Sequence, residues 1–361
     1  MKKILILANN DMGLYKFRRE LIENLSKEHQ VYVSVPKGDY SEELEKMGCK
    51  LHFLDMERRG VNPIKELSLI KYYKKLIKAV SPDIVFTYTI KPNIYGGIAC
   101  RKRKVPYASN ITGLGTAIEN GGFFSKILFR LYRIGIKNAS VVFFQNSYNK
   151  KLFEDKKIVT KKSVLLPGSG VNLESNPFEE YPSDDEKIVL LFVGRLMKDK
   201  GVEELIKSAK NLKSKYENLH FKLVGPLEEE YSTELEKLKP EKYVELCGMQ
   251  KDVHRFMKEA HAIVVPSYHE GMSNVCLEAA ACGRPLLASR IPGCIKTFDE
   301  GISGLGFEPR DTESLQEVIE KFISIPKEKR AEMGRAGRLK MENEFSRETI
   351  INKYMEIVEN L

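Results

Sequence analysis

The stretch AIVVPSYHEGMSNVCLEAAACGRPLLASR (262–290) shows how the second half of the chain is built. Apolar runs open and close it, and each has the length of a buried strand. Between them, Ser273 is placed to cap a short helix over Asn274–Cys282, with Gly283 just past its end. A strand, a loop, a helix and a second strand in this order predict a βαβ unit with parallel strands.

The same alternation runs through both halves of the chain. Expected strands cover 3–9, 31–35, 51–56, 83–89, 107–112 and 140–145, then 188–194, 220–225, 244–249, 262–267 and 285–290. Two successive βαβ series predict an α/β protein with two Rossmann-like domains. The Pro- and acid-rich segment NPFEEYPSDDEK (176–187) is the expected boundary, which gives domains at 1–175 and 176–345. The last helical stretch, 346–361, is a candidate to cross back to the first domain.

Composition bounds the class of protein. A length of 361 residues suits two domains, and 42% apolar with 30% charged residues is globular. No apolar run reaches the roughly 18 residues of a membrane span, and the start MKKILILA is a better strand than a signal peptide. The six cysteines contain no CxxC pair, which favours reduced thiols in the cytoplasm and argues against a zinc site.

Charge is distributed unevenly along the chain. Residues 1–180 hold 31 Lys and Arg against 18 Asp and Glu, whereas residues 181–361 hold 28 against 32. A basic first half indicates an anionic ligand or an anionic surface on that side, with nucleic acid or acidic lipid as the bulk options.

The loop and helix of the opening stretch carry groups that suit a nucleotide. Ligands of open α/β sheets bind beyond the carboxyl ends of the strands. The helix start offers N–H groups to a phosphate, and Glu278, further along the helix, can accept from a ribose diol. Glu270 in the loop can accept from hydroxyls of a group attached to that phosphate. The alternative is a capped helix with two solvated glutamates. The expected phosphate-binding amides belong to Gly271, Met272, Ser273 and Asn274.

A second loop, GRLMKDKGVEEL (194–205), adds two cations. Arg195 directly follows an expected strand, and Lys200 precedes the next helix. Arg can clamp a diphosphate through two contacts and Lys can act as a point charge. Ordinary loop charge is the competing interpretation, and it is weaker for an Arg that adjoins a strand end.

Together these motifs resemble a known family. Gly-Arg-Leu with Lys200-Gly201, followed by Glu270 and Glu278 in an E-x7-E spacing, resembles the nucleotide-sugar-dependent glycosyltransferases of family four. The segments PGSGVN (167–172) and ACGRPLLASRIPG extend the similarity. The resemblance implies the GT-B fold, with two Rossmann-like domains facing a cleft, and transfer with retention. It also implies catalytic roles for Arg195, Lys200 and Glu270, while no general base is evident.

The first half narrows the resemblance to one branch. YTIKPNIYGG (88–97) and NITGLGTA (110–117) look like the enzymes that extend capsule, O-antigen or protein-glycan precursors on a polyprenyl diphosphate. In that branch these loops face the acceptor. Tight-turn glycines and surface charge are the competing explanation for each residue. The expected acceptor-binding residues are Arg18, Lys91, Asn93, Gly113 and Gly115.

One helical stretch suggests membrane contact. In GGFFSKILFRLYRIGIKNA (121–139) four basic residues recur at helical spacing beside apolar ones, and RKRK (101–104) lies nearby. This pattern is typical of a helix in an anionic membrane interface. The alternative is a helix that buries its apolar face in the domain core. The stripe consists of Lys126, Arg130, Arg133 and Lys137.

These patterns lead to a single functional hypothesis with two rivals. We expect a UDP-sugar-dependent enzyme that extends a polyprenyl-diphosphate-linked saccharide, with an N-acetylhexosamine as the expected sugar. No phosphate-loop, dinucleotide or DxD motif is present, so the reaction is expected to need no metal and no cofactor beyond the donor. The expected location is the cytoplasmic face of a membrane, without a nucleic-acid partner. The rivals are a UDP-sugar hydrolase or epimerase on the same fold and a basic nucleic-acid-binding protein.

Overall fold

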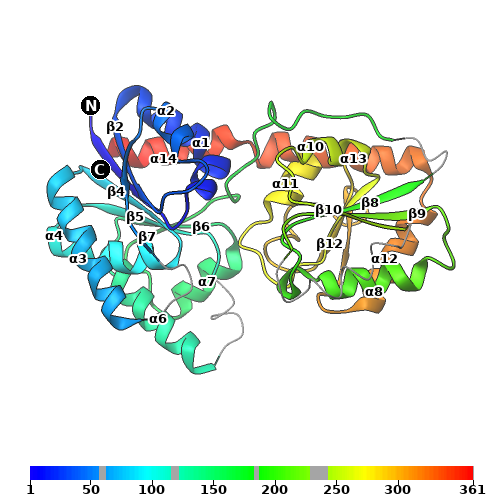
Figure 1. Ribbon diagram of the computed structural model, residues 1–361, viewed down its shortest axis with the longest axis horizontal. Helices are drawn as coiled ribbons and strands as arrows, with labels where there is room; N and C mark the ends of the chain where they lie inside the picture. The colour runs from blue at the N-terminus through cyan, green and yellow to red at the C-terminus, as the bar shows by residue number, and fades with distance from the viewer. Residues whose placement is uncertain (57–61, 115–121, 183–186, 228–242, 361) are drawn as a thin grey trace. The chain divides into compact units, whose positions relative to one another are not determined.

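The computed structural model describes all residues except 57–61, 115–121, 183–186, 228–242 and 361 (Figure 1). The chain divides into two compact units. The first unit comprises Met1–Ser169 and Glu348–Leu361, and the second comprises Gly170–Arg347. Each unit is a parallel sheet with helices on both faces, so the α/β fold with two Rossmann-like domains is confirmed.

In the described part of the first unit, the sheet has seven parallel strands in the order β3-β2-β1-β4-β5-β6-β7. The six expected strands are present. The strand β7 was not expected, because KSVL is short and its end residues are exposed. The strands are β1 (Lys3–Leu7), β2 (Gln30–Val35), β3 (Lys50–Phe53), β4 (Ile84–Tyr88), β5 (Tyr107–Ile111), β6 (Val141–Phe144) and β7 (Lys162–Leu165).

Alternation along each buried strand divides the helices of the first unit between the two faces of the sheet. Ile4 and Ile6 of β1 point to one cluster of helices, and Leu5 and Leu7 point to the other. The first cluster holds α1 (Asp11–Glu28), α2 (Ser41–Lys46) and α14 (Arg347–Asn360). The second holds α3 (Pro63–Val80), the π-helix η1 (Pro92–Gly96), α4 (Gly97–Arg103), α6 (Gly122–Ile136) and α7 (Ser147–Asp155).

The C-terminal helix α14 completes the core of the first unit. Its residue Tyr354 is fully buried, with ring centres 4.6 Å from Phe143 and 5.6 Å from Phe86. The Tyr354 hydroxyl donates a hydrogen bond to Asn110 Oδ1 at the end of β5. The last helix therefore belongs structurally to the domain that begins the chain.

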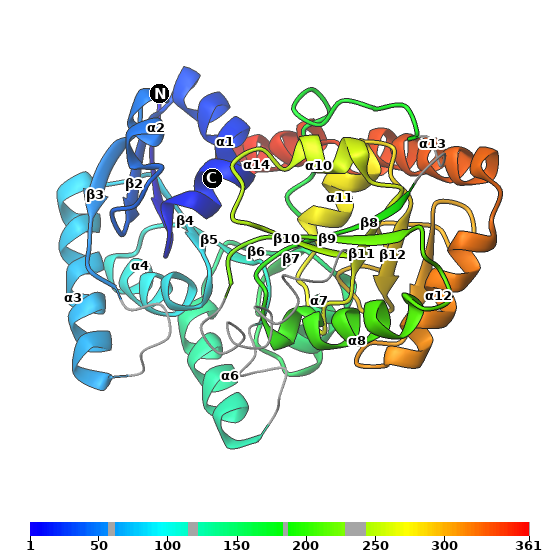
Figure 2. The ribbon, with the colours of Figure 1, turned by 45° about the vertical axis from the view of Figure 1, so that its right-hand side comes forward.

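In the described part of the second unit, six parallel strands follow the order β10-β9-β8-β11-β12-β13. Helices α8 (Val202–Leu212) and α12 (Thr312–Ser324) cover one face (Figure 2). Helices α10 (His254–Glu259), α11 (Asn274–Ala281) and α13 (Lys327–Glu344) cover the other. The strands are β8 (Ile188–Val193), β9 (Leu219–Val224), β10 (Val244–Gly248), β11 (Ala262–Val265), β12 (Leu286–Ser289) and β13 (Gly304–Phe307).

The boundary between the units lies ahead of the segment expected to contain it. The Val171 N–H donates to Phe345 O at 2.8 Å, which ties the chain after Ser169 to the end of the second unit. The carbonyls of Glu179 and Glu180 accept from buried Arg284. The described part of the acid-rich segment is thus attached to the second unit and is not a linker, because backbone carbonyls anchor it.

Both sheets contain a topological switch point. In the first unit the chain order reverses between β1 and β4, and in the second it reverses between β8 and β11. The carboxyl ends of the strands at such a switch point are where α/β proteins bind ligands.

Two sequence-based expectations concern the environment of the chain. All six cysteines carry free thiols, as predicted. Among the described helices, none is long and apolar enough to cross a membrane.

Candidate active site

The loop after β11 leads into α11 at the switch point of the second unit. Ser273 Oγ accepts the Cys276 N–H at 3.3 Å, which confirms the predicted helix cap. The helix ends at Ala281, one residue earlier than predicted, and Gly283 follows with φ of 74°. The residues of α11 that are not buried are Asn274, Val275 and Glu278, so Glu278 lies on the same helix face as the first helical residue.

The two predicted loops meet at the Lys200–Glu270 ion pair. Lys200 Nζ contacts Glu270 Oε1, and the side chains are 23% and 18% exposed. Ser267 Oγ donates to the same carboxylate oxygen at 2.9 Å. The cation predicted from the β8 loop therefore lies beside the carboxylate predicted from the β11 loop.

Backbone contacts fix this meeting of the loops. The Tyr268 N–H donates to Asp199 O at 2.9 Å. Gly201 has φ of 69°, and a Cβ at this position would lie 2.1 Å from Pro266 O. Only glycine fits there, which gives a structural reason for the Lys-Gly pair in the sequence.

Arg195 occupies the other flank of the β8 loop. It follows the end of β8 and is exposed, while the next residue, Leu196, donates its N–H to Pro226 O at 2.9 Å. This contact directs the start of the loop toward β9, whereas Lys200 lies toward β11. Both cations are at the carboxyl edge of the sheet, and the structure joins Lys200 to the Glu270 loop.

Sequence reasoning assigned no role to several residues that support this loop. The Tyr268 hydroxyl donates to Glu204 Oε1 at 2.7 Å, and the Arg310 guanidinium lies 4.7 Å from the Tyr268 ring centre. Burial, aided by Glu204, raises the pKa of Tyr268. Burial, aided by Arg310, lowers the pKa of His269. No spacing pattern could have identified these contacts, because they join two separate loops and the helix α8.

A third loop closes the site from the side of β12. The Ser273 N–H donates to Gly293 O at 2.9 Å. A Cβ on Gly293 would lie 2.4 Å from Glu270 O, so this backbone approach also requires glycine. The Pro-Gly dipeptide after β12 is a sequence signal for a turn of this kind.

At the switch point of the first unit, Arg18 of α1 is a buried cation. It is 5% exposed, and its guanidinium lies 5.3 Å from the Tyr88 ring centre. With the Gln145 amide oriented to satisfy both of its ends, the amide oxygen accepts from Arg18 Nη2 at 3.0 Å. Among the described residues, no Asp or Glu pairs with Arg18, and its Nε has no hydrogen-bond partner. A buried positive charge of this kind favours a nearby anion.

The other predicted acceptor residues have different environments. Lys91 Nζ pairs with Glu66 Oε1 at 2.6 Å, and both side chains are largely buried. Asn93 is fully buried, and its amide accepts from Thr87 Oγ1 at 2.6 Å and donates to Asn110 O at 2.8 Å. Its amide therefore joins the ends of β4 and β5, and the acceptor contact predicted for Asn93 stays a prediction.

The predicted Gly-Leu-Gly loop is described only in part. Gly113 follows β5 and is half-buried. Gly115 lies outside the described residues, so its predicted role stays a prediction.

The turn after β4 is strained. Thr89 has φ of 72°, which costs a β-branched residue about 1–3 kcal/mol. The π-helix η1 begins three residues later, and Lys91 lies between the two irregularities. Strained residues and π-turns concentrate at functional sites, so this turn adds support for a site at the β1/β4 switch point.

The fold and these loops define a class of protein. Two Rossmann-like domains, with a cation, a carboxylate and a helix start at one switch point, are the arrangement of GT-B glycosyltransferases. Residues 3–146 match the family model "Glycosyl transferase 4-like", and residues 174–340 match "Glycosyl transferases group 1". The chain belongs to the glycosyltransferase family that these two models describe.

Similar proteins support this assignment. An N,N'-diacetylbacillosaminyl-diphospho-undecaprenol alpha-1,3-N-acetylgalactosaminyltransferase of Campylobacter jejuni is 27% identical over 90% of both chains. The capsular polysaccharide glycosyltransferase CapM of Staphylococcus aureus is 29% identical over 84% of this chain and 85% of its own. The crystal structure of Anabaena HepE with UDP-glucose has a TM-score of 0.83 over 100% of both chains, at 19% identity. The structural likeness confirms the fold.

Proposed function

We propose that this glycosyltransferase moves a sugar, in our hypothesis an N-acetylhexosamine, from a UDP-sugar to a polyprenyl-diphosphate-linked saccharide, with retention and without a metal. The observation that carries the proposal is the Lys200–Glu270 pair beside the start of α11. A cation and helix N–H groups suit the diphosphate, and the glutamate suits hydroxyls of the sugar attached to it.

The reaction needs stabilisation of the departing diphosphate. As the bond from the anomeric carbon to the diphosphate breaks, negative charge grows on the leaving oxygen. Lys200 and the first amides of α11 can stabilise this charge directly, because they are already held in position by Glu270 and the Ser273 cap. These groups would take the role that a divalent ion plays in other transferases.

The nucleoside would extend from the diphosphate along the same edge of the sheet. Glu278 lies on the helix face that includes Asn274, where it can accept from the two ribose hydroxyls. The Gly225 N–H donates to Gly248 O at 2.9 Å, which joins the loops after β9 and β10. Exposed Leu227 and Met249 in these loops offer apolar surface to a base.

The first unit would bind the acceptor at its own switch point. Buried Arg18 has no carboxylate partner in the described chain, so an acceptor diphosphate near the ends of β1 and β4 would supply the missing anion. The Campylobacter and Staphylococcus relatives, whose names specify a diphospho-undecaprenol glycan and a capsule, support this acceptor class.

Release of UDP tests the proposal. The protein would be incubated with UDP-N-acetylhexosamines, with and without a short-chain prenyl-diphosphate-linked saccharide. We expect UDP to form at an appreciable rate only when the acceptor is present. Rapid consumption of the donor without an acceptor would instead favour a hydrolase or epimerase.

Substitution of Glu278 should abolish most of the thermal stabilisation by UDP. Loss of charge-assisted hydrogen bonds to the ribose weakens binding by roughly 10- to 100-fold, and ligand stabilisation falls with affinity. The measurement compares the UDP-induced shift in melting temperature for Glu278→Ala and for Glu317→Ala, an exposed glutamate on α12. A Glu278→Ala protein that responds to UDP like its parent would contradict the ribose assignment.

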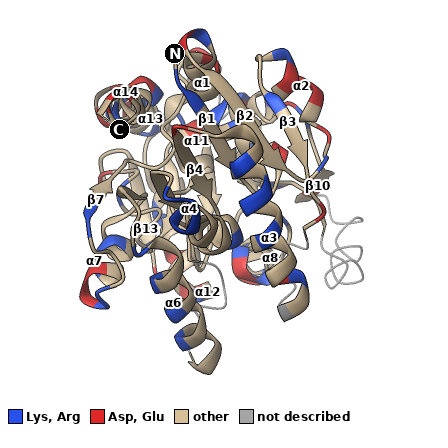
Figure 3. Cartoon of the chain, turned by 90° about the vertical axis from the view of Figure 1, so that its left-hand side faces the viewer, with Lys and Arg blue, Asp and Glu red and all other residues tan. Residues whose placement is uncertain are grey.

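We also propose that α6 contacts an anionic membrane at the cytoplasmic side. The structure divides the apolar residues of α6 between two faces. Leu128 and Leu131 pack against the core, whereas Phe123 and Phe124 are 73% and 71% exposed. Lys126, Arg130 and Arg133 are exposed on α6, and Lys137 is exposed just past its end. Figure 3 shows further basic positions on α4 and α3. Exposed rings with adjacent cations are typical of interfacial helices.

Removal of the two exposed rings should reduce vesicle binding. We expect Phe123→Ser/Phe124→Ser to lower the fraction that sediments with phosphatidylglycerol vesicles by at least about 5-fold. Leu339→Ser, at an exposed apolar residue of α13, should bind like the parent. The fraction of the parent protein that sediments with phosphatidylglycerol vesicles should fall as salt increases. Equal fractions sedimenting with neutral and with anionic vesicles would rule out the electrostatic contribution.

A further inference from the structure

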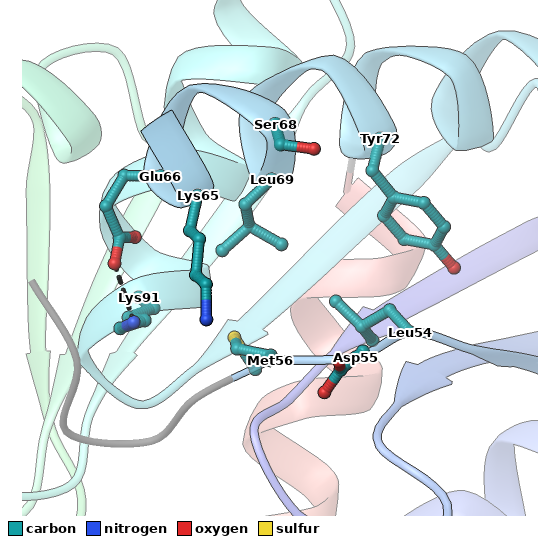
Figure 4. A pocket seen from close by; sticks show the side chains of 9 residues that line it. All are labelled: Leu54, Asp55, Met56, Lys65, Glu66, Ser68, Leu69, Tyr72 and Lys91. Atoms are coloured by element: carbon teal, nitrogen blue, oxygen red, sulfur yellow. Dashed lines mark hydrogen bonds and ion pairs between the residues drawn. The ribbon is translucent and has the colours of Figure 1, made fainter. Parts of the chain in front are cut away.

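A cavity of about 450 Å³ lies in the first unit, between the residues that follow β3 and the first half of α3 (Figure 4). Its volume is in the range of small-molecule sites. Lys91, at the β1/β4 switch point, lines one end of it. The cavity is therefore continuous with the turn where the acceptor is expected to bind.

The charges that line the cavity are balanced. Lys65 and Lys91 are matched by Asp55 and Glu66, and Figure 4 shows Lys91 paired with Glu66. Because two cations and two carboxylates line the cavity, the lining has no net positive charge to attract a diphosphate. A neutral polar ligand fits this balance better. The cavity thus differs from the surroundings of Arg18, which favour an anion.

One atom in the cavity lacks a partner. Glu66 is 8% exposed, and its Oε2 has no hydrogen bond among the described residues. Burial, aided by the nearby Glu66 carboxylate, raises the pKa of Tyr95. An ionised carboxylate oxygen only accepts hydrogen bonds, so a ligand with an N–H or O–H donor fits this position.

Apolar surface lies beside this acceptor atom. Met56 and Leu69 line the cavity between the Lys91–Glu66 pair and the Tyr72 ring, and Leu54 lies at the Tyr72 end (Figure 4). The Tyr72 hydroxyl donates to Phe53 O at 3.4 Å and lies 3.3 Å from Ser34 Oγ, which orients the ring. A hydroxyl group would satisfy Glu66 but would leave the aliphatic surface without a contact. An acetamido group offers an N–H donor and a methyl group together.

We propose that this cavity binds a sugar of the acceptor that carries an acetamido group. The amide N–H donates to Glu66 Oε2, and the acetyl methyl packs on Leu69 and Met56. Lys91 is a positioning residue that holds the Glu66 carboxylate. The proposal rests on the acceptor-binding role proposed above for the first unit, and it adds the chemical class of the acceptor sugar.

Titration with two matched probes tests the proposal. The probes are geranyl diphosphate linked to 2-acetamido-2-deoxyglucose and geranyl diphosphate linked to glucose, which differ only at the acetamido position. We expect the full chain to bind the acetamido probe at least about 10-fold more tightly, the value of one charge-assisted hydrogen bond. Equal dissociation constants would overturn the proposal.

A double variant assigns the preference to Glu66. Glu66→Leu/Lys91→Met removes both charges, so no unpaired ion stays buried and the fold is preserved. We expect its preference for the acetamido probe over the glucose probe to fall by about 10-fold. Glu45→Gln, on the exposed side of α2, should keep the preference of the parent protein. A double variant that still discriminates between the probes would also overturn the proposal. The titration contains no donor, so failure of sugar transfer would be detected separately by the UDP-release assay.

Discussion

Lys200→Met should lower kcat/KM for sugar transfer by about 100- to 1,000-fold, the usual cost of losing one group that stabilises charge in a transition state. Lys200 is the cation that the structure joins to the Glu270 loop. Methionine keeps the length and bulk of the side chain but cannot stabilise the departing diphosphate. It also leaves the Glu270 carboxylate without its counter-ion, which adds repulsion toward the phosphate.

Initial rates over a range of UDP-sugar concentrations would measure this effect. Lys198→Met is the matched control, because Lys198 is an exposed lysine in the same short 3-10 helix, Lys198–Lys200. We expect the control to stay within about 3-fold of the parent, since exposed loop charges contribute little. A Lys200→Met enzyme with parental kcat/KM and an unchanged melting temperature would exclude the proposed role of Lys200.

The second large effect concerns stability. Arg284→Met should destabilise the second unit by about 3–5 kcal/mol, because Arg284 is a fully buried residue whose guanidinium donates to five backbone carbonyls of the described residues. Removing it leaves several buried acceptors unsatisfied and releases the segment before β8. Its acceptors are Met257 O at 2.8 Å, Lys258 O at 3.1 Å, Gly283 O at 3.1 Å, Glu179 O at 3.0 Å and Glu180 O at 2.8 Å.

Calorimetry would detect this loss as a fall of about 10 °C in the melting temperature of the second unit. Because the two units need not unfold together, the transition that UDP shifts identifies the second unit. Arg335→Met, an exposed arginine on α13, should change the midpoint by less than about 2 °C. A similarly small change for Arg284→Met would show that the carbonyls find other partners.

Most strands could be predicted because their residues are strongly apolar and branched. The runs that form β8 and β11 are bounded by charged or turn residues, so length and composition were sufficient. The strand β13 was missed because its sequence, GLGF, contains two glycines and no branched β-former. Its place in the sheet comes from pairing with β12, which is a tertiary effect.

The domain boundary depends on long-range contacts. The segment after Ser169 contains turn-forming and acidic residues that are typical of a linker. Its described part is held by carbonyl contacts with Arg284, more than 100 positions away in the chain. Amino-acid composition indicates only the local tendency to form a turn or a linker, so it could not show that Arg284 holds this segment against the second unit.

The donor-side residues were predictable because topology brings them together. In a parallel sheet, loops after neighbouring strands share one edge, so Lys200 after β8 and Glu270 after β11 were expected to be close. The acceptor side was less predictable. Glu66 belongs to no motif, and its burial depends on Lys91, 25 residues later. The sequence also does not show that the Asn93 amide forms hydrogen bonds with Thr87 and Asn110 inside the fold.

A crystal structure of the protein with UDP would test the central claim most directly. We expect diphosphate oxygens within about 3 Å of Lys200 Nζ and of the amides at the start of α11, with Glu278 accepting from the ribose hydroxyls. A diphosphate bound elsewhere, away from both Lys200 and the Gly271–Asn274 amides, would contradict the proposed donor site and the mechanism that depends on it.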